Sequence, residues 1–246
     1  MTILATDSNR LSSIVKWELA PEQGVCRENV TINAAAATYK VGAVLGKTLT
    51  SATVTTSTAV ATPITFSAFT VAGYAETGVY KLVMTSSTAF NLYKPAASGA
   101  APSLVGTGVL GTATVPANAG GLTFTATTAG SPAAGDTYFL NVAGTYKYKL
   151  CEASATDGSQ VAAGIYINDV NGLSQDLAVP ATTDTKAVAI VRGPVILAQG
   201  GGTYTVGNIS IPQGGLTYGS SISTATQIAT MLSQLKALGI AVETTI

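Results

Sequence analysis

The stretch VGAVLGKTL, residues 41–49, has the residue types of a phosphate-binding loop. Gly42 and Gly46 precede Lys47 and Thr48, and a P-loop uses such residues to wrap N–H groups and a cation around phosphate. Only three residues separate these two glycines, however, whereas a P-loop needs four. The next residues, TLTSATVTTST, predict a strand and not the helix whose N-terminus would hold the anion. We therefore expect a glycine-bounded hairpin turn here.

A second glycine-rich stretch, GTGVLG at 106–111, matches the G-x-G-x-x-G pattern of dinucleotide sites. Such a site also needs a helix that begins at the last glycine and an acidic residue about 20 positions later. Here TATVPANAGG follows, and no acidic residue comes before Asp136. We interpret this stretch as a glycine-rich β turn.

The stretch NDVNGLSQD, residues 168–176, has the polar residues of a calcium loop. Aligning Gly172 with the sixth position of such a loop puts Ile167 at the first position and Ala178 at the twelfth, where carboxylates are required. Asx turns explain these residues better. We expect no metal here.

Catalytic chemistry has little support elsewhere in the chain. There is no histidine, which removes the commonest general base and the commonest transition-metal ligand. Cys26 has no imidazole base to activate it. Two unpatterned cysteines do not make a disulfide framework, so we expect Cys26 and Cys151 to be free buried thiols. Glu152 and Asp157 are a conceivable carboxylate pair, but nothing in their spacing favours catalysis. The sequence predicts no enzyme, no cofactor and no metal site.

The composition limits the partners. Only 10% of residues are charged and the net charge is zero, so the electrostatic signature of a nucleic-acid-binding protein is absent. No apolar run reaches the roughly 18 residues that a membrane helix needs. The nearest, AVAIVRGPVILA, is interrupted by Arg192 and Pro194, and the first ten residues lack the pattern of a secretory signal. We expect neither a nucleic-acid nor a membrane partner.

The charges divide the chain into regions. Seven of the 24 lie in the first 30 residues, but only four lie between residues 48 and 145. Residues 1–25 show no clear period and predict a mostly extended arm. Its Trp17, the only tryptophan, is either a core residue packed against the first hairpin or an anchor for a partner.

The remaining patterns predict a mainly β protein. Residues 27–49 predict strand, turn and strand, and the middle region contains short alternating runs separated by turn residues, as in a β-sandwich. VAAGIYIND and KAVAIVRGPVIL predict buried strands. One helix is predicted near the end, with Thr224 and Gln227 as a capping box and Gly239 as its terminator. Its apolar face comprises Ile228, Met231, Leu232, Leu235 and Leu238. IAVETTI predicts a closing strand.

Five stretches, in this order, resemble the head decoration proteins of lambda-like tailed bacteriophages. They are CRENVTIN, YKVGAVLGKT, YKLCEASATDGSQVAAGIYINDV, KAVAIVRGPVIL and LKALGIAV. The resemblance implies a β-clip-like decoration core from residues 26–48 and 146–246, with one C-terminal helix. It also implies that residues 49–145 are an inserted β-sandwich-like domain, whose ends lie close together.

The resemblance further implies homotrimers at three-fold positions on the outside of the expanded head, where they stabilise the shell against internal DNA pressure. The protein would be made in the bacterial host cytoplasm and then reside on the virion. The partner would be the major capsid protein, bound by residues 1–25 through strand addition and by many weak contacts together. The candidate capsid-contact residues are Lys16, Trp17, Glu18, Leu19, Arg27 and Glu28.

Two other classes remain open. One is another phage structural protein, of the tail or baseplate, with a similar β composition. The other is a glycan-binding adhesin, in which the Thr-rich insert and some of the ten tyrosines would bind a host-surface glycan. Binding to purified capsids or to glycans distinguishes them.

Overall fold

The structure is a computed structural model of the chain. It describes residues 11–58, 64–95, 101–111, 113–114, 120–128, 130–173, 175–200, 203–206, 209–212 and 215–243. The chain divides into two compact units, residues 1–48 with 147–246 (unit 1) and residues 49–146 (unit 2). Both boundaries fall inside long strands, β4 (Val44–Thr58) and β11 (Thr137–Leu150). The predicted insert, 49–145, lies within the residues of unit 2.

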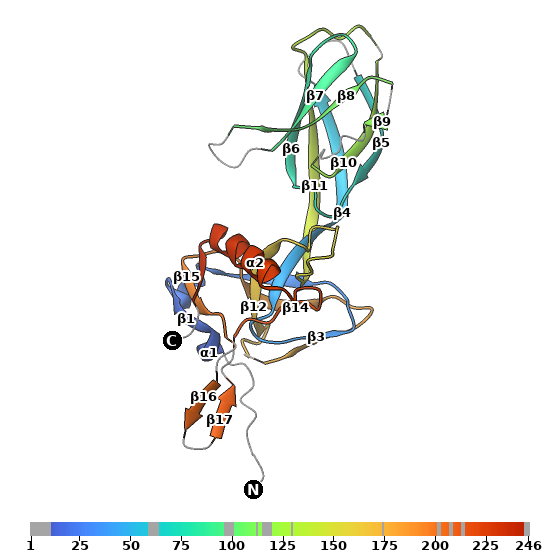
Figure 1. The fold of residues 1–246 in the computed structure, drawn as a ribbon. Coiled ribbons are helices and arrows are strands. Elements are labelled where there is room, and N and C mark those ends of the chain that lie inside the picture. Colours follow the sequence, from blue (N-terminus) through green and yellow to red (C-terminus); the bar gives the residue numbers. More distant parts are fainter. Residues whose placement is uncertain are drawn as a thin grey trace. The chain divides into compact units, whose positions relative to one another are not determined.

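Unit 1 is built from short strands and one long helix (Figure 1). Together with parts of β4 and β11, its elements are α1 (Leu11–Ile14), β1 (Val15–Glu18), η1 (Pro21–Gln23), β2 (Arg27–Ile32), β3 (Ala37–Tyr39), β12 (Ala162–Asp169), β13 (Leu177–Val179), β14 (Thr185–Ile190), β15 (Val195–Ala198), β16 (Thr203–Val206), β17 (Ile209–Pro212), α2 (Ala225–Ala237) and β18 (Ile240–Glu243). The main sheet has the order β2-β14-β12-β4-β11, and smaller sheets have the orders β1-β15-β18, β13-β3 and β16-β17.

The core of unit 1 forms around β12, in which all eight residues are buried. This strand lies between β14 and β4 in the sheet, and α2 packs against it. A strand covered on both faces needs a continuous apolar run, which AAGIYI provides. The buried-strand prediction for this stretch is confirmed.

Helix α2 begins and ends as its sequence indicates. Thr224 Oγ1 accepts the N–H of Gln227, and Gln227 Oε1 accepts the N–H of Thr224, which completes the capping box. Met231 and Leu235 are buried, and the other three residues of the predicted apolar face are partly buried against the same core. Gly239 follows the helix with a φ of 79°, and β18 is the predicted closing strand.

Two predicted features of unit 1 are wrong. Residues 27–49 do not form a hairpin, because β2 pairs with β14, β3 pairs with β13, and β4 pairs with β12 and β11. KAVAIVRGPVIL is not one strand: β14 ends at Ile190, and β15 begins after the Gly193–Pro194 peptide in a different sheet. Proline lacks the N–H that a continuing ladder would use.

In unit 2, the regular elements of the described residues are all strands. Apart from its shares of β4 and β11, these are β5 (Ile64–Val71), β6 (Gly78–Met84), β7 (Ala89–Lys94), β8 (Ser103–Val109), β9 (Ala113–Thr114) and β10 (Leu122–Thr128). One sheet has the order β4-β11-β6-β7-β8 and the other β5-β10-β9. Aromatic rings join them: Phe124 of β10 lies 6.1 Å from Phe90 of β7, and Phe66 of β5 lies 6.1 Å from Tyr138 of β11, measured between ring centroids.

The mainly β fold with one long C-terminal helix is confirmed. In unit 2, apolar and polar residues alternate along the strands, so that one face of a strand is buried and the other is more exposed to solvent. Tyr80, Leu82 and Met84 of β6 are buried, whereas Val79 and Lys81, at alternate positions of the strand, are exposed. Threonine and serine occupy many of the water-facing positions, which explains how the unit needs so few charges.

Candidate interaction surface

The first described residues are part of unit 1 and not a separate arm. Ile14, at the end of α1, is fully buried in the core. β1 pairs antiparallel with β15, with Trp17 opposite Ile196 and Glu18 opposite Val195. The prediction of a mostly extended arm outside the core is therefore correct only in part for residues 11–25: β1 is extended, but Leu11, Ile14 and Val15 pack in the core of unit 1. The sequence did not indicate this burial, because the stretch around Ile14, LSSIV, is too short to show a helical or strand periodicity. Residues 1–10 lie outside the described residues.

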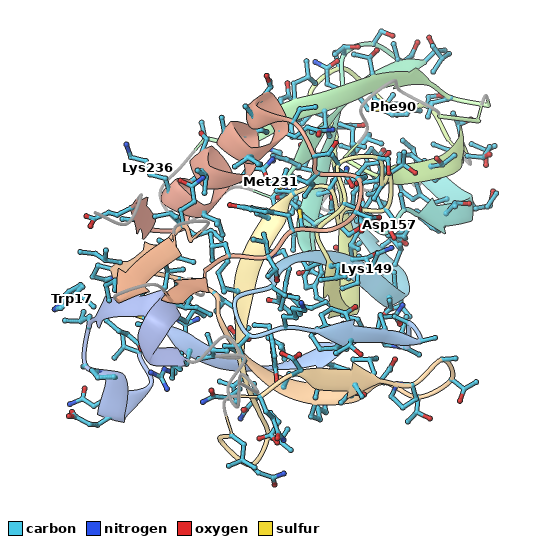
Figure 2. All side chains as sticks on the ribbon, turned by 60° about the horizontal axis from the view of Figure 1, so that its bottom comes forward. Trp17, Phe90, Lys149, Asp157, Met231 and Lys236 are labelled. Carbon is cyan, nitrogen blue, oxygen red and sulfur yellow. The ribbon has the colours of Figure 1, made fainter. Side chains whose placement is uncertain are left out.

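A bulge in β1 sets which side chains face outward. The register with β15 shifts between Val15 and Trp17, so that Lys16 and Trp17 are both exposed although they are adjacent. A bulge redirects side chains in this way. Trp17 is 48% exposed, and Figure 2 shows it projecting at the periphery. Of the two roles considered for Trp17, the core residue is excluded.

Glu18 turns inward instead and is held by Arg27. The guanidinium donates from Nε to Oε1 over 2.9 Å and from Nη2 to Oε2 over 2.6 Å, a bidentate pair. The Glu18 side chain is only 2% exposed. The hydrogen bond to Glu18, with its charge, raises the pKa of Arg27 against the opposing effect of burial. These two candidate contact residues thus bind each other and fix β1 to β2.

Two further apolar side chains are exposed beside β1. Leu19 is 42% exposed and Val25 is 39% exposed. They flank the buried Cys26, whose thiol lies 3.9 Å from the Leu19 carbonyl oxygen and 3.6 Å from that of Pro194. We call Lys16, Trp17, Leu19 and Val25 the β1 surface. Val25 was not a predicted contact residue; its place between Gly24 and Cys26, outside any alternating run, gives no signal in the sequence.

A charged pair adjoins the β1 surface. Arg192 donates from Nε to the Val25 carbonyl oxygen over 2.9 Å and from Nη1 to Glu28 over 3.4 Å. Both side chains of the pair are about half exposed, at 54% and 51%. Glu28, one of the predicted capsid-contact residues, is thus exposed, and its charge is balanced by Arg192 from the β14–β15 connection.

The β1 surface lies at a sheet edge. In the order β1-β15-β18, β1 is an end strand, and in the described ranges no strand pairs with its outer side. An edge strand offers N–H and C=O groups to a further strand. The arrangement combines main-chain hydrogen-bonding groups with an exposed tryptophan, the residue type most enriched at binding hot spots.

The stretches that resembled phosphate sites have structural explanations. Gly42 lies in a turn before β4 with a φ of 91°, and Gly46 is inside β4 beside Ala162 of β12. GTGVLG continues β8 to Val109 and then turns at Gly111, with no helix. Of the glycines in that stretch, only Gly111 is in the predicted turn. Gly108 lies inside β8, where a side chain would overlap the ring of Phe90.

The calcium-like stretch forms the predicted Asx turn. Asp169 Oδ1 accepts the N–H groups of Asn171 and Leu173, at 2.8 and 2.9 Å. Backbone hydrogen bonding from Leu173, with the other donors, lowers the pKa of Asp169. Among the described residues, no group of three His, Cys, Asp or Glu side chains is arranged to hold a metal ion.

Glu152 and Asp157 bind separate partners. Glu152 accepts the N–H groups of Ser220 and Ser221 and the hydroxyl of Ser221. Asp157 Oδ1 accepts the Ser159 hydroxyl at 2.6 Å, and its Oδ2 accepts from Lys149 at 2.9 Å. Both carboxylates thus secure turns of unit 1. Cys26 and Cys151 are free and buried, as predicted, and burial raises the pKa of Cys151 to about 12.

Replacing Asp157 by asparagine should lower the free energy of unfolding at neutral pH by about 1 kcal/mol. Burial opposes ionisation of Asp157, but Ser159 and Lys149 lower its pKa to about 2. A carboxyl with a lowered folded-state pKa stabilises the protein above its unfolded-state pKa, and this contribution is lost as the pH falls from about 4 to about 2. Denaturant unfolding across this range measures it.

The Asp157→Asn difference should therefore disappear near pH 2. Glu22→Gln, on the exposed η1 turn, removes the same charge and serves as a control that should cost almost nothing. Equal stability of Asp157→Asn and the native protein at neutral pH would contradict the structural role of this turn.

Comparison with known proteins leaves the chain without an assigned family. No family model and no curated protein sequence matches it. Two crystal structures of Xanthomonas campestris FlgL match among solved structures. In space group H3 the identity is 18% over 43% of this chain and 33% of FlgL, with a TM-score of 0.28. In space group C2 the identity is 20% over 44% of this chain and 30% of FlgL, with a TM-score of 0.22.

The match thus spans about a third of the FlgL chain, and at these TM-scores the likeness carries no argument about fold or function. As regards membranes, no helix in the described part of the chain is long and apolar enough to cross one.

Proposed function

We propose that this protein is a capsid decoration protein of a tailed bacteriophage, which binds the outside of the expanded head through the β1 surface. The observation that carries the proposal is an edge strand with a half-exposed tryptophan, Trp17, beside Leu19 and Val25. The five stretches that resemble decoration proteins support it as well, because all of them belong to unit 1.

The proposed binding mode uses both parts of the β1 surface. A strand of the major capsid protein adds to the outer edge of β1 and forms main-chain hydrogen bonds. Trp17 then fills an apolar pocket of the partner and excludes water. The Arg27–Glu18 pair and the buried Ile14 hold β1 in place before binding, so that little ordering entropy opposes association.

The direct test mixes the protein with expanded capsids that lack it, taken from the phage that encodes the chain. We expect co-sedimentation with expanded capsids, density on their outer surface by electron microscopy, and no binding to unexpanded precursors. Protein found only on tails or baseplates would contradict the proposal, and so would failure to bind expanded capsids.

We further propose that the bound form is a homotrimer at three-fold positions. Repeated weak contacts from three chains then add through multivalency, which explains stable binding by a small surface. Three-fold density in capsid reconstructions and a trimeric species in sedimentation at high protein concentration are the expected results. A single chain per site on the capsid would contradict this.

A further inference from the structure

A small pocket in unit 2 combines an exposed aromatic ring with a fixed pair of charges. Its volume is about 270 Å³. Six residues form its lining: Tyr74, Glu76, Tyr80, Lys94, Val105 and Gly120. All of them belong to unit 2, so the pocket is independent of the β1 surface and of the proposed capsid binding.

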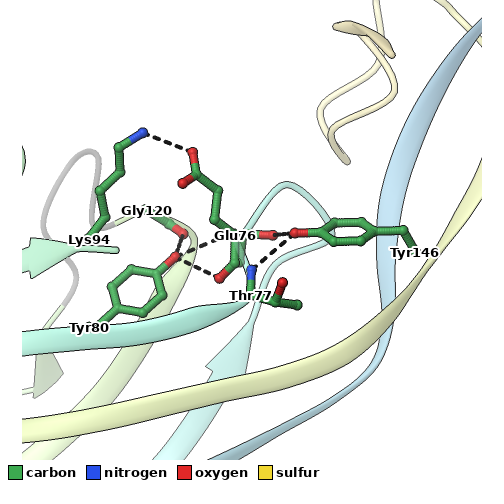
Figure 3. A network of polar contacts seen from close by, with 7 residues as sticks. Glu76, Thr77, Tyr80, Lys94, Gly120 and Tyr146 are labelled. Carbon is green, nitrogen blue, oxygen red and sulfur yellow. Dashed lines mark hydrogen bonds and ion pairs between the residues drawn. The ribbon is translucent and has the colours of Figure 1, made fainter. Parts of the chain in front are cut away.

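The base of the pocket is rigid because two tyrosines, the buried Tyr80 and the partly buried Tyr146, hold one short segment. The Tyr80 hydroxyl accepts the N–H of Glu76 at 3.2 Å and lies 3.1 Å from the Glu76 carbonyl oxygen and 3.0 Å from that of Gly120. Burial raises the pKa of Tyr80 to about 12, so the phenol stays neutral. The Tyr146 hydroxyl accepts the N–H of Thr77 and donates to the Ala75 carbonyl oxygen (Figure 3).

Gly120 keeps one side of the pocket clear. Its φ is 61°, which favours glycine, and a Cβ atom here would lie 3.0 Å from the Tyr80 ring. A larger residue would therefore crowd the tyrosine that organises the base. Together, these contacts fix the backbone of residues 75–77 before any ligand binds.

The rim of the pocket is polar on one side and apolar on the other. Lys94 Nζ donates to Glu76 Oε1 over 2.8 Å, and these side chains are 34% and 53% exposed. Because the two charges cancel, the rim has no net charge, yet it presents both a donor and an acceptor (Figure 3). Tyr74 is 50% exposed and Val105 is partly buried.

We propose that this pocket binds one or two residues of a neutral carbohydrate. A pyranose ring has an apolar C–H face, which suits the exposed ring of Tyr74, and hydroxyl groups that both donate and accept, which suit Glu76 and Lys94. A purely apolar ligand would desolvate the ion pair without replacing its contacts with water. An ionised ligand would have to separate Lys94 from Glu76. The volume lies just below the usual range of small-molecule pockets, which also favours a small sugar.

The test uses the full chain, labelled with ¹⁵N, and records amide chemical shifts during sugar titrations. D-glucose, D-galactose and N-acetyl-D-glucosamine are the neutral probes, N-acetylneuraminic acid is the charged probe, and cyclohexanol is the apolar probe. We expect saturable shifts with at least one neutral sugar in the millimolar range, confined to the amides of Glu76, Thr77, Lys94, Val105 and Gly120.

Tyr74→Ala should weaken that affinity about tenfold, because it removes the exposed ring from the rim. Lys94→Met should also weaken it by removing the donor. Val109→Ala is the matched control, since Val109 lies on β8 with 51% exposure and does not line the pocket. The amide spectra of the variants report whether each is folded.

Three results would overturn the proposal: no saturable shift with any neutral sugar, tighter binding of the charged or apolar probe, or unchanged affinity in a folded Tyr74→Ala variant. Capsid binding by any of these variants is a separate measurement, so the failure of this proposal is distinguishable from the failure of the proposed function.

Discussion

Replacing Gly46 by alanine is expected to destabilise the protein by about 3 kcal/mol. Gly46 lies in β4, where the register with β12 shifts between Ala162 and Gly164. A Cβ atom at this position would lie 2.2 Å from the Ser159 carbonyl oxygen and 2.6 Å from its Cα atom. Both atoms belong to the backbone, so no side chain can rotate away, and the strand itself has to move. Denaturant unfolding measures the loss.

Gly172→Ala is the matched control for this prediction. Gly172 has a φ of 77° but no atom near the position of a Cβ, so the substitution adds conformational strain without overlap. We expect a loss of about 1 kcal/mol there. If Gly46→Ala were no worse than Gly172→Ala, the close approach of β4 to Ser159 would be wrong. The glycines of VGAVLGKTL therefore allow close packing of backbone segments in unit 1. Their resemblance to a phosphate-binding loop is limited to residue type.

Features that depend on neighbouring residues were predictable from the sequence. The capping box of α2 needs only Thr224 and Gln227, which are three residues apart, and the helix stop needs only Gly239. The Asx turn at Asp169 is equally local. Alternation along β6 and the continuous apolar run of β12 identified strands, because burial on one face or on both faces leaves its own periodicity.

Strand pairing was not predictable, because it depends on residues far apart in the chain. β2 pairs with β14 more than 150 positions away, and nothing near Arg27 indicates this. The surfaces had the same difficulty. A lone tryptophan with no periodic neighbours is equally compatible with burial and exposure. The bulge in β1, which the sequence does not indicate, is what exposes Trp17. In the pocket of unit 2, Glu76 of the β5–β6 connection meets Lys94 at the end of β7, and no sequence motif indicates this pairing.

Replacing Trp17 by alanine is expected to weaken binding to expanded capsids about 30-fold, or about 2 kcal/mol, if the β1 surface is the binding site. The free energy of unfolding should change little, because half of the side chain already faces water. The backbone of β1 stays paired with β15 in this variant, so the sheet edge itself is preserved. Sedimentation of expanded capsids with increasing amounts of each protein measures the affinity.

Two further variants separate binding from stability. Val161→Ala is the matched surface control, because Val161 belongs to unit 1 and is also 48% exposed, but it directly precedes β12, a strand of a different sheet from β1. It should bind capsids like the native protein. Ile14→Ala should lower the free energy of unfolding by about 3 kcal/mol, since Ile14 is fully buried at the end of α1, directly before β1. If Trp17→Ala occupied capsids at the native concentration, Trp17 would not be the anchor. If it lost as much stability as Ile14→Ala, Trp17 would have a role in the core of unit 1 that its exposure does not indicate.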